Sequence, residues 1–277
     1  MENQVTTQQQ TKSLSELMHS PAVVGKLNEV WNNKQMANSF ISSVISVANG
    51  NPQLRKAEPM SIIGAAMVAS TMQLQVIPTL GQCYIIPYGS KAQFQVGYLG
   101  LLQLCQRSGQ FKKILAAPVH EGEYISGDEF DEDYIFDRTK RKSDKVIGYM
   151  AKFELLNGFT KVAYWDIDKV KSHATKFSQA FRAGYNSPWK SDFDAMAQKT
   201  VLKSILKFAP KSIEMQNAVA FDQAVVNTNT SDVQDLDIDA FAPEYVDNIE
   251  SEKRENFAEK AAEAAKANVN ESKNDNR

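Results

Sequence analysis

Four lysines recur at every fourth position in one segment and form the most informative pattern in this chain. Lys199, Lys203, Lys207 and Lys211 lie in AMAQKTVLKSILKFAPKS, and no acidic residue separates the first from the last. A step of four residues turns only about 40° around an α-helix, so the first three ammonium groups are expected on one side. A solvated helix face and a surface for a polyanion both fit this pattern. The lack of neutralising acids favours the polyanion.

The lysine segment has the features of a helix with clear ends. Ser191 followed by Asp194 is typical of an N-terminal capping box, and Pro210 predicts an end after Ala209. The apolar residues of the segment fall mainly on another side of this helix, where they would face a core: Leu202, Ile205, Leu206 and Ala209. Successive lysines would rise about 6 Å along the axis, close to the phosphate spacing of an extended single strand.

Further basic residues are interleaved with aromatic ones. This mixture suits single-stranded nucleic acid, because cations follow the backbone while each ring offers a stacking face worth about 1–3 kcal/mol. The alternative is structural: Phe94 and Tyr98 as core residues, Trp189 as a packing anchor, and Lys91 as a solvated residue at a hairpin tip. Together with the four lysines, the candidate DNA-binding residues are Lys91, Phe94, Tyr98, Arg107, Lys112, Lys113, Arg182 and Lys190.

One segment concentrates carboxylates. A two-metal nuclease would need a few of them to converge on Mg²⁺ in a pocket. Gly122 and Gly127 interrupt any regular framework here, which favours a solvated acidic loop and leaves open a divalent ion bound without catalysis. The eight acids are Glu121, Glu123, Asp128, Glu129, Asp131, Glu132, Asp133 and Asp137.

Several enzyme classes lack their motifs in this chain. There is no GxxxxGK[ST], GxGxxG, HExxH or GxSxG, so an ATP-driven motor is not expected. The two cysteines and three isolated histidines form no metal-ligand spacing and no disulfide framework, and the lack of disulfides is expected in a reducing cytoplasm. The polar N-terminus predicts no signal peptide, and no apolar run reaches membrane-spanning length.

Charge and composition suggest three parts within the 277 residues: a flexible segment over 1–20, a core over 21–221 and an acidic tail over 222–277. The tail holds 14 acidic and 6 basic residues, whereas residues 1–221 hold 19 and 25. The tail is expected to be largely disordered, with a short polar helix near 252–269 that is marginal alone.

Periodicity predicts a mixed α+β core. Helices are expected over 22–34, 35–48, 59–74, about 98–108 and 166–173. Residues 82–88 and 92–96 should form a hairpin around Gly89-Ser90, and a second hairpin over 146–156 and 159–165 should turn at Asn157-Gly158. A further strand is expected near 111–119.

Two segments carry a family resemblance. IIPYGSKAQFQVGYLGLLQLCQRSG, followed by SPWKSDFDAMAQKTVLKSILKFAPKS, resembles the RecT family of phage single-strand annealing proteins, over roughly residues 25–221. The PYG turn, the GYxG helix start, the RSG stop, and SPW followed by DFDxMAxKT occur in family order. The family often has arginine where this chain has Lys203, which keeps the charge but loses the bidentate fork.

The resemblance implies an α+β core with a β-hairpin packed on helices. It implies a non-enzymatic protein that coats single-stranded DNA, assembles into rings or filaments, and anneals complementary strands without ATP through a duplex intermediate. Implied partners are further copies of the chain, a phage 5′→3′ exonuclease and the host single-strand-binding protein, in the bacterial cytoplasm and away from membranes. No cofactor is expected, and non-catalytic Mg²⁺ is left open.

These inferences combine into one expected groove. Lys199, Lys203 and Lys207 would form its floor, with Arg107, Lys112 and Lys113 on a wall. Three alternatives stay open: a protector that binds single strands without annealing them, a metal-dependent nuclease acting through Glu121 and Glu123, and an interaction scaffold with incidental basic charge.

Overall fold

The N-terminal part of the protein is a helical layer. The computed structural model describes residues 12–185 and 187–244. The predicted helices are confirmed with shifted ends, and a short helix precedes them. The layer comprises α1 (Leu14–Met18), α2 (Pro21–Trp31), α3 (Lys34–Gly50), the 3₁₀ turn η1 (Leu54–Lys56) and α4 (Pro59–Thr71).

Helix α4 packs on a four-stranded antiparallel sheet. Its residues 61–70 are all buried, as its almost wholly apolar sequence predicts. The 3₁₀ turn η2 (Pro78–Leu80) leads into the predicted hairpin of β1 (Cys83–Tyr88) and β2 (Lys91–Val96). The strand order is β1-β2-β8-β9, with β8 (Ala224–Asn227) and β9 (Ala242–Glu244) supplied by the C-terminal segment.

A second antiparallel sheet has the strand order β3-β6-β7. It comprises β3 (Phe111–His120), β6 (Val146–Leu155) and β7 (Thr160–Asp166), and the predicted turn at Asn157-Gly158 joins the last two. Between β3 and β6 lie the short pair β4 (Tyr124–Ser126) and β5 (Ile135–Phe136) and the 3₁₀ turn η3 (Arg138–Lys140).

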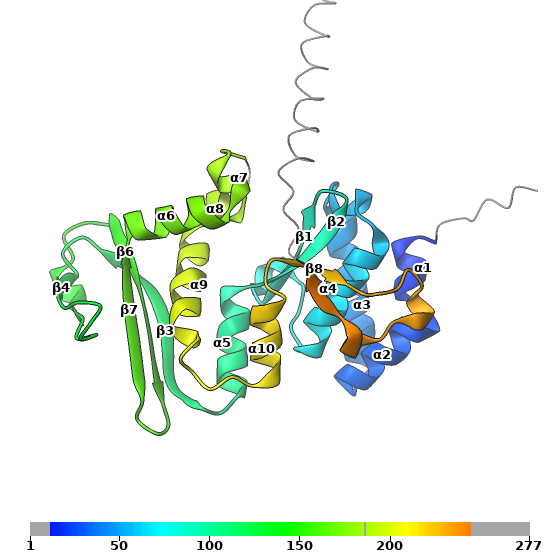
Figure 1. The fold of residues 1–277 in the computed structure, drawn as a ribbon, viewed down its shortest axis with the longest axis horizontal. Coiled ribbons are helices and arrows are strands. Elements are labelled where there is room, and N and C mark those ends of the chain that lie inside the picture. Colours follow the sequence, from blue (N-terminus) through cyan, green and yellow to red (C-terminus); the bar gives the residue numbers. More distant parts are fainter. Residues whose placement is uncertain (1–11, 186, 245–277) are drawn as a thin grey trace, which may run out of the picture.

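The remaining helices link the two sheets. Helix α9 packs on all three strands of the second sheet and on α5, while α6 lies across β6 and β7. Figure 1 shows α6 to α8 along one end of that sheet, with α5 and α10 between α9 and the helical layer. Their bounds are α5 (Tyr98–Arg107), α6 (Ile167–Phe177), α7 (Gln179–Arg182), α8 (Pro188–Ser191), α9 (Phe193–Leu206) and α10 (Ile213–Ala220).

The expected boundary between core and tail at residue 222 differs from the structure. Residues 222–244 pack on the body because their apolar side chains, among them Val225, Val233 and Leu236, are buried. They form β8, the 3₁₀ turns η4 (Val233–Asp235) and η5 (Ile238–Ala240), and β9. Residues 245–277, with the predicted helix near 252–269, lie outside the described residues.

The expected flexible segment over residues 1–20 also differs in its later part. Ser13 caps α1 with a complete capping box formed with Glu16, and Met18 is buried against the core. Residues 1–11 lie outside the described part.

Candidate nucleic-acid interface

Helix α9 begins one residue later and ends three residues earlier than its sequence pattern predicts. Asp192, not Ser191, is the N-cap, and its side chain accepts a hydrogen bond from the Ala195 backbone N–H at 3.1 Å. The last helical residue is Leu206, so Lys207 is the C-cap and Lys211 lies beyond the helix. Only Lys199 and Lys203 of the four lysines therefore lie within the helix.

The first two lysines share one carboxylate. Lys199 Nζ lies 2.8 Å from Asp222 Oδ1, and Lys203 donates to Asp222 Oδ2. Asp222 follows the end of α10 and also accepts the backbone N–H of Val96 from β2 at 3.2 Å. Asp222 thus joins α9 to the first sheet.

Burial and charge both act on this ion-paired group. Burial alone raises the pKa of Asp222, but the neighbouring ammonium groups of Lys199 and Lys203 outweigh it and hold this pKa below its ordinary value. Burial lowers the pKa of Lys199, and the carboxylate of Asp222 only partly opposes this. Two lysine side chains therefore face one buried carboxylate at the middle of α9.

The expected open row of lysines is wrong for Lys199. This residue is only 4% exposed, so it cannot form the floor of a groove on the surface. Lys203 keeps 31% of its side-chain exposure, and Lys207 and Lys211 are exposed. Local periodicity placed the lysines on one side correctly, but it could not show that Asp222 would fold back onto that side.

The two aromatic candidates in the first hairpin region are part of the structure's interior. Phe94 is fully buried, so the stacking role expected of it is wrong. The Tyr98 hydroxyl lies 3.2 Å from both the backbone N and the backbone O of Ala116, and its ring packs against the core. Tyr98 therefore positions α5 on β3.

Several predicted cations are engaged by the chain itself. Lys91 lies 3.7 Å from Glu244, and Lys112 lies 2.6 Å from Glu154. Arg107 donates to the backbone carbonyl of Met72 at 2.7 Å. Lys113 is exposed on the same strand as Lys112. The expected wall of Arg107, Lys112 and Lys113 is thus partly occupied by internal contacts.

A cavity of about 230 Å³ includes the ion-paired residues Lys199, Asp222 and Lys203 in its lining. Three rings that contact one another in a row line this cavity. The centroids of Trp165 and His173 are 5.4 Å apart, and those of His173 and Phe177 are 4.5 Å apart. Trp189 lines it from α8. We call this the aromatic cavity; its full lining is Trp165, His173, Phe177, Trp189, Met196, Lys199, Thr200, Lys203, Ser204, Asp222 and Gln223.

A second depression lies on the other side of α6. It is an open surface hollow with a volume of about 500 Å³, and we call it the basic hollow. It is lined by Asp168, Lys171, Ser172, Thr175, Lys176 and Arg182. The hollow and the aromatic cavity adjoin at the end of α6, because Lys176 Nζ lies 5.2 Å from the centroid of the Phe177 ring.

Of the predicted residues, the structure brings Lys199 and Lys203 to the aromatic cavity and Arg182 to the basic hollow. Lys190 is exposed on α8 and donates to the carbonyl of Gly184. Sequence reasoning missed Lys171, Lys176, His173 and Phe177. Their four- and five-residue spacings in DKVKSHATKF were the available signal, but the helix was expected to end at 173.

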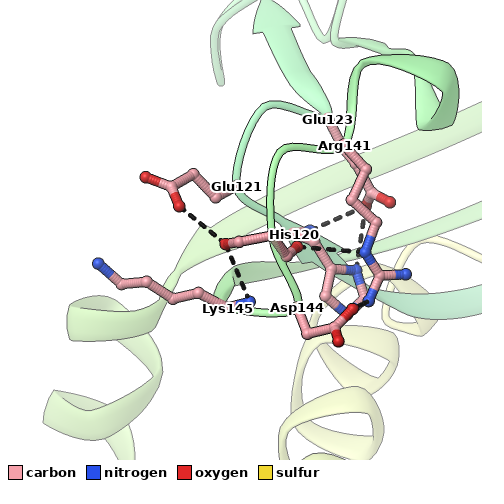
Figure 2. Close-up of polar contacts among 7 residues, drawn as sticks. His120, Glu121, Glu123, Arg141, Asp144 and Lys145 are labelled. Atoms are coloured by element: carbon pink, nitrogen blue, oxygen red, sulfur yellow. Dashed lines mark hydrogen bonds and ion pairs between the residues drawn. The ribbon is translucent and has the colours of Figure 1, made fainter.

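The acidic segment does not form a convergent metal site. Glu123 is buried and accepts the His120 backbone N–H at 2.8 Å, while Glu121 accepts the hydroxyl of Ser143 at 2.8 Å (Figure 2). Further along, Glu129 and Glu132 pair with Lys169 and Lys161. Among the described residues, no group of three or more potential ligands could hold a metal ion. The geometry therefore gives the nuclease alternative no support.

Comparison with known proteins identifies the family. The RecT family model matches residues 38–235. The chain is 42% identical over 252 residues to the uncharacterized protein YqaK of Bacillus subtilis, covering 91% of this chain and 84% of that one. It is 29% identical over 184 residues to protein RecT of Escherichia coli, covering 62% of this chain and 66% of that one.

The chain belongs to the RecT family, as the resemblance of its hairpin and lysine segments predicted. The mixed α+β architecture with small antiparallel sheets agrees with that assignment. Within residues 12–185 and 187–244, no helix is both long and apolar enough to cross a membrane.

Proposed function

We propose that this protein binds single-stranded DNA and anneals complementary strands in homologous recombination without hydrolysing ATP. One observation carries the proposal: the exposed cations of the basic hollow adjoin an exposed aromatic side chain, Phe177, at the mouth of the aromatic cavity. Cations that follow the phosphates beside rings that accept bases are the combination that single-strand binding uses. Family membership supports the same function.

The cations would act on the phosphate backbone. Lys171, Lys176 and Arg182 form one set on α6 and α7, and the exposed Lys207 and Lys211 form a second set beyond α9. Contacts of this kind carry no sequence information, so binding is expected to tolerate any sequence. Lys199 is too buried to reach the phosphates, and it lines the aromatic cavity instead.

Annealing needs no chemical energy source in this account. Neutralising one backbone removes the repulsion that keeps two strands apart, and a second strand can then sample registers. Correct stacking contributes about 1.4 kcal/mol for each base-pair step, so about eight matched steps provide roughly 11 kcal/mol. No nucleotide cofactor is required, and any Mg²⁺ would act as a counterion.

We infer that the protein works as a homo-oligomer, in a ring or a filament, and holds the duplex intermediate as it forms. A heterologous contact between copies produces such rings or filaments, depending on whether the rotation closes. A phage 5′→3′ exonuclease that exposes single strands and the host single-strand-binding protein are the partners this activity would need. The bacterial cytoplasm is the compartment where all of them would meet.

Mixing two complementary labelled oligonucleotides with the protein, in the absence of nucleotide, tests this function. We expect duplex to form faster than in the protein-free mixture, and electron microscopy of the same mixture should show assemblies. A protein that binds both strands but slows duplex formation would be a protector, and that result would contradict the proposal.

A further inference from the structure

The aromatic cavity contains features that phosphate binding does not explain. Phe177 keeps 63% of its surface exposed, although it belongs to a contiguous wall with His173 and Trp165. The exposed part of this ring is free to stack on a further flat group, which is how single-strand-binding proteins hold bases. Below this wall, the ammonium groups of Lys199 and Lys203 point to Asp222.

The size of the cavity restricts what can enter. Its volume of about 230 Å³ lies below the range of about 300–1,000 Å³ that is usual for sites of whole small-molecule ligands. A nucleoside triphosphate would therefore not fit, whereas a single flat ring system would. The sugar and phosphate attached to such a ring would remain outside, near Lys176 and the basic hollow.

The polar groups of the cavity suit the edge of a base. Lys199 and Lys203 each carry three donors, and Asp222 uses only part of them. Thr200 and Ser204 donate their hydroxyl hydrogens to the carbonyls of Met196 and Val201, so their oxygens remain available as acceptors. In the described part of the chain, the buried Nδ1 of His173 has no hydrogen-bond partner.

We propose that the aromatic cavity seats one nucleobase of the bound single strand, stacked on the ring wall of Trp165, His173 and Phe177. This inference rests on the proposed function, because it adds a base subsite to the phosphate contacts of the basic hollow. The ammonium donors of Lys199 and Lys203 favour bases that carry a carbonyl oxygen. A base held in the cavity is turned away from the neighbouring bases of its strand. One nucleotide per subunit would then be unable to pair with the complementary strand.

The experiment compares oligothymidylate with an abasic strand of the same length and the same number of phosphates. The full chain is used with Trp31→Phe, so that its two remaining tryptophans, Trp165 and Trp189, both line the cavity. Binding is measured by the anisotropy of an end label, and seating by tryptophan fluorescence. We expect oligothymidylate to quench the fluorescence and the abasic strand to bind without quenching it.

Phe177→Ala supplies the second measurement, with Phe130→Ala as the matched control, because Phe130 is 97% exposed on the acidic loop. Phe177→Ala should weaken oligothymidylate binding by about 5-fold to 150-fold and leave abasic binding unchanged. Equal quenching by both strands, or a Phe177→Ala effect that is the same for both, overturns the base seat alone. Failure of oligothymidylate to bind overturns the proposed function as well.

Discussion

Asp222 is the residue that decides what the lysines of α9 can do. Its carboxylate pairs with Lys199 and Lys203 at once and accepts a backbone hydrogen bond from β2. A pair taken so completely out of water is sensitive to the loss of either partner, because the remaining charge stays buried. Of the four regularly spaced lysines, Lys199 and Lys203 therefore belong to a structural ion pair, and Lys207 and Lys211 are the exposed cations.

We expect Asp222→Asn to destabilise the protein by about 3–5 kcal/mol, because it leaves Lys199 buried without a counter-charge. Lys199→Met should lower the free energy of unfolding by less, since Asp222 then keeps Lys203 as its partner. Urea unfolding followed by circular dichroism measures both. Glu154→Gln is the control, because it removes an ion pair whose lysine is exposed. Equal stability of all three variants would contradict the role given to Asp222.

His173 makes stability depend on pH. Burial, together with the ammonium groups of Lys176 and Lys203, lowers the pKa of this histidine below its ordinary value of about 6.5. The unfolded chain then binds a proton that the folded chain does not, so stability should fall as pH decreases below about 6.5.

The melting temperature of the protein and of His173→Phe, measured between neutral pH and pH 5, tests this expectation. The variant keeps a ring in the wall but cannot titrate. A smaller loss of stability in the variant on acidification is the expected result, and identical pH profiles would exclude His173 as the cause.

Among the elements, the position of α5 depends on two glycines, its N-cap Gly97 and Gly100 in its first turn. A Cβ at Gly97 would lie 2.0 Å from the carbonyl oxygen of Gly81, and a Cβ at Gly100 would lie 2.0 Å from that of Gln82. The GYxG helix start thus allows the backbone before β1 to cross close to the helix. This contact holds the first hairpin against the helix that leads into β3.

Gly100→Ala should therefore destabilise the protein by about 1–3 kcal/mol, because backbone atoms must shift to admit the methyl group. Gly25→Ala on α2 is the matched control: a Cβ at this position would meet no atom within 4 Å, so helix propensity should make it stabilising by up to about 1 kcal/mol. Thermal unfolding of the two variants should show opposite signs, and a stable Gly100→Ala variant would contradict the close crossing.

Most elements could be predicted from the sequence because their signals are local. The turn residues of the two hairpins specify those hairpins directly, at Gly89-Ser90 and at Asn157-Gly158. The apolar body of α4 likewise specifies a buried helix. The candidate site could be predicted only in part. Burial of Lys199 depends on Asp222, and the aromatic cavity depends on β7, α6 and α8 meeting α9, which are long-range contacts that no local pattern encodes.

At the scale of the whole molecule, an acidic segment near the first sheet and a cluster of cations near the second sheet lie in different parts of the protein. Residues 223–244 contain five acidic and no basic residues, and they pack beside the helical layer (Figure 1). The basic hollow lies on α6 and α7, at the end of the other sheet. A polyanion is therefore expected to approach at α6 and α7, and residues 223–244 would keep the part of the protein built on the first sheet free of DNA.

The salt dependence of single-strand binding tests this account most directly. In the triple variant Lys171→Ala/Lys176→Ala/Arg182→Ala, the log–log slope of affinity against salt concentration should fall by about 2, since each lost phosphate contact removes about 0.7. Lys34→Ala, an exposed lysine on α3, should leave the slope unchanged. An unaltered slope and affinity in the triple variant would contradict the claim that DNA phosphates bind at the basic hollow.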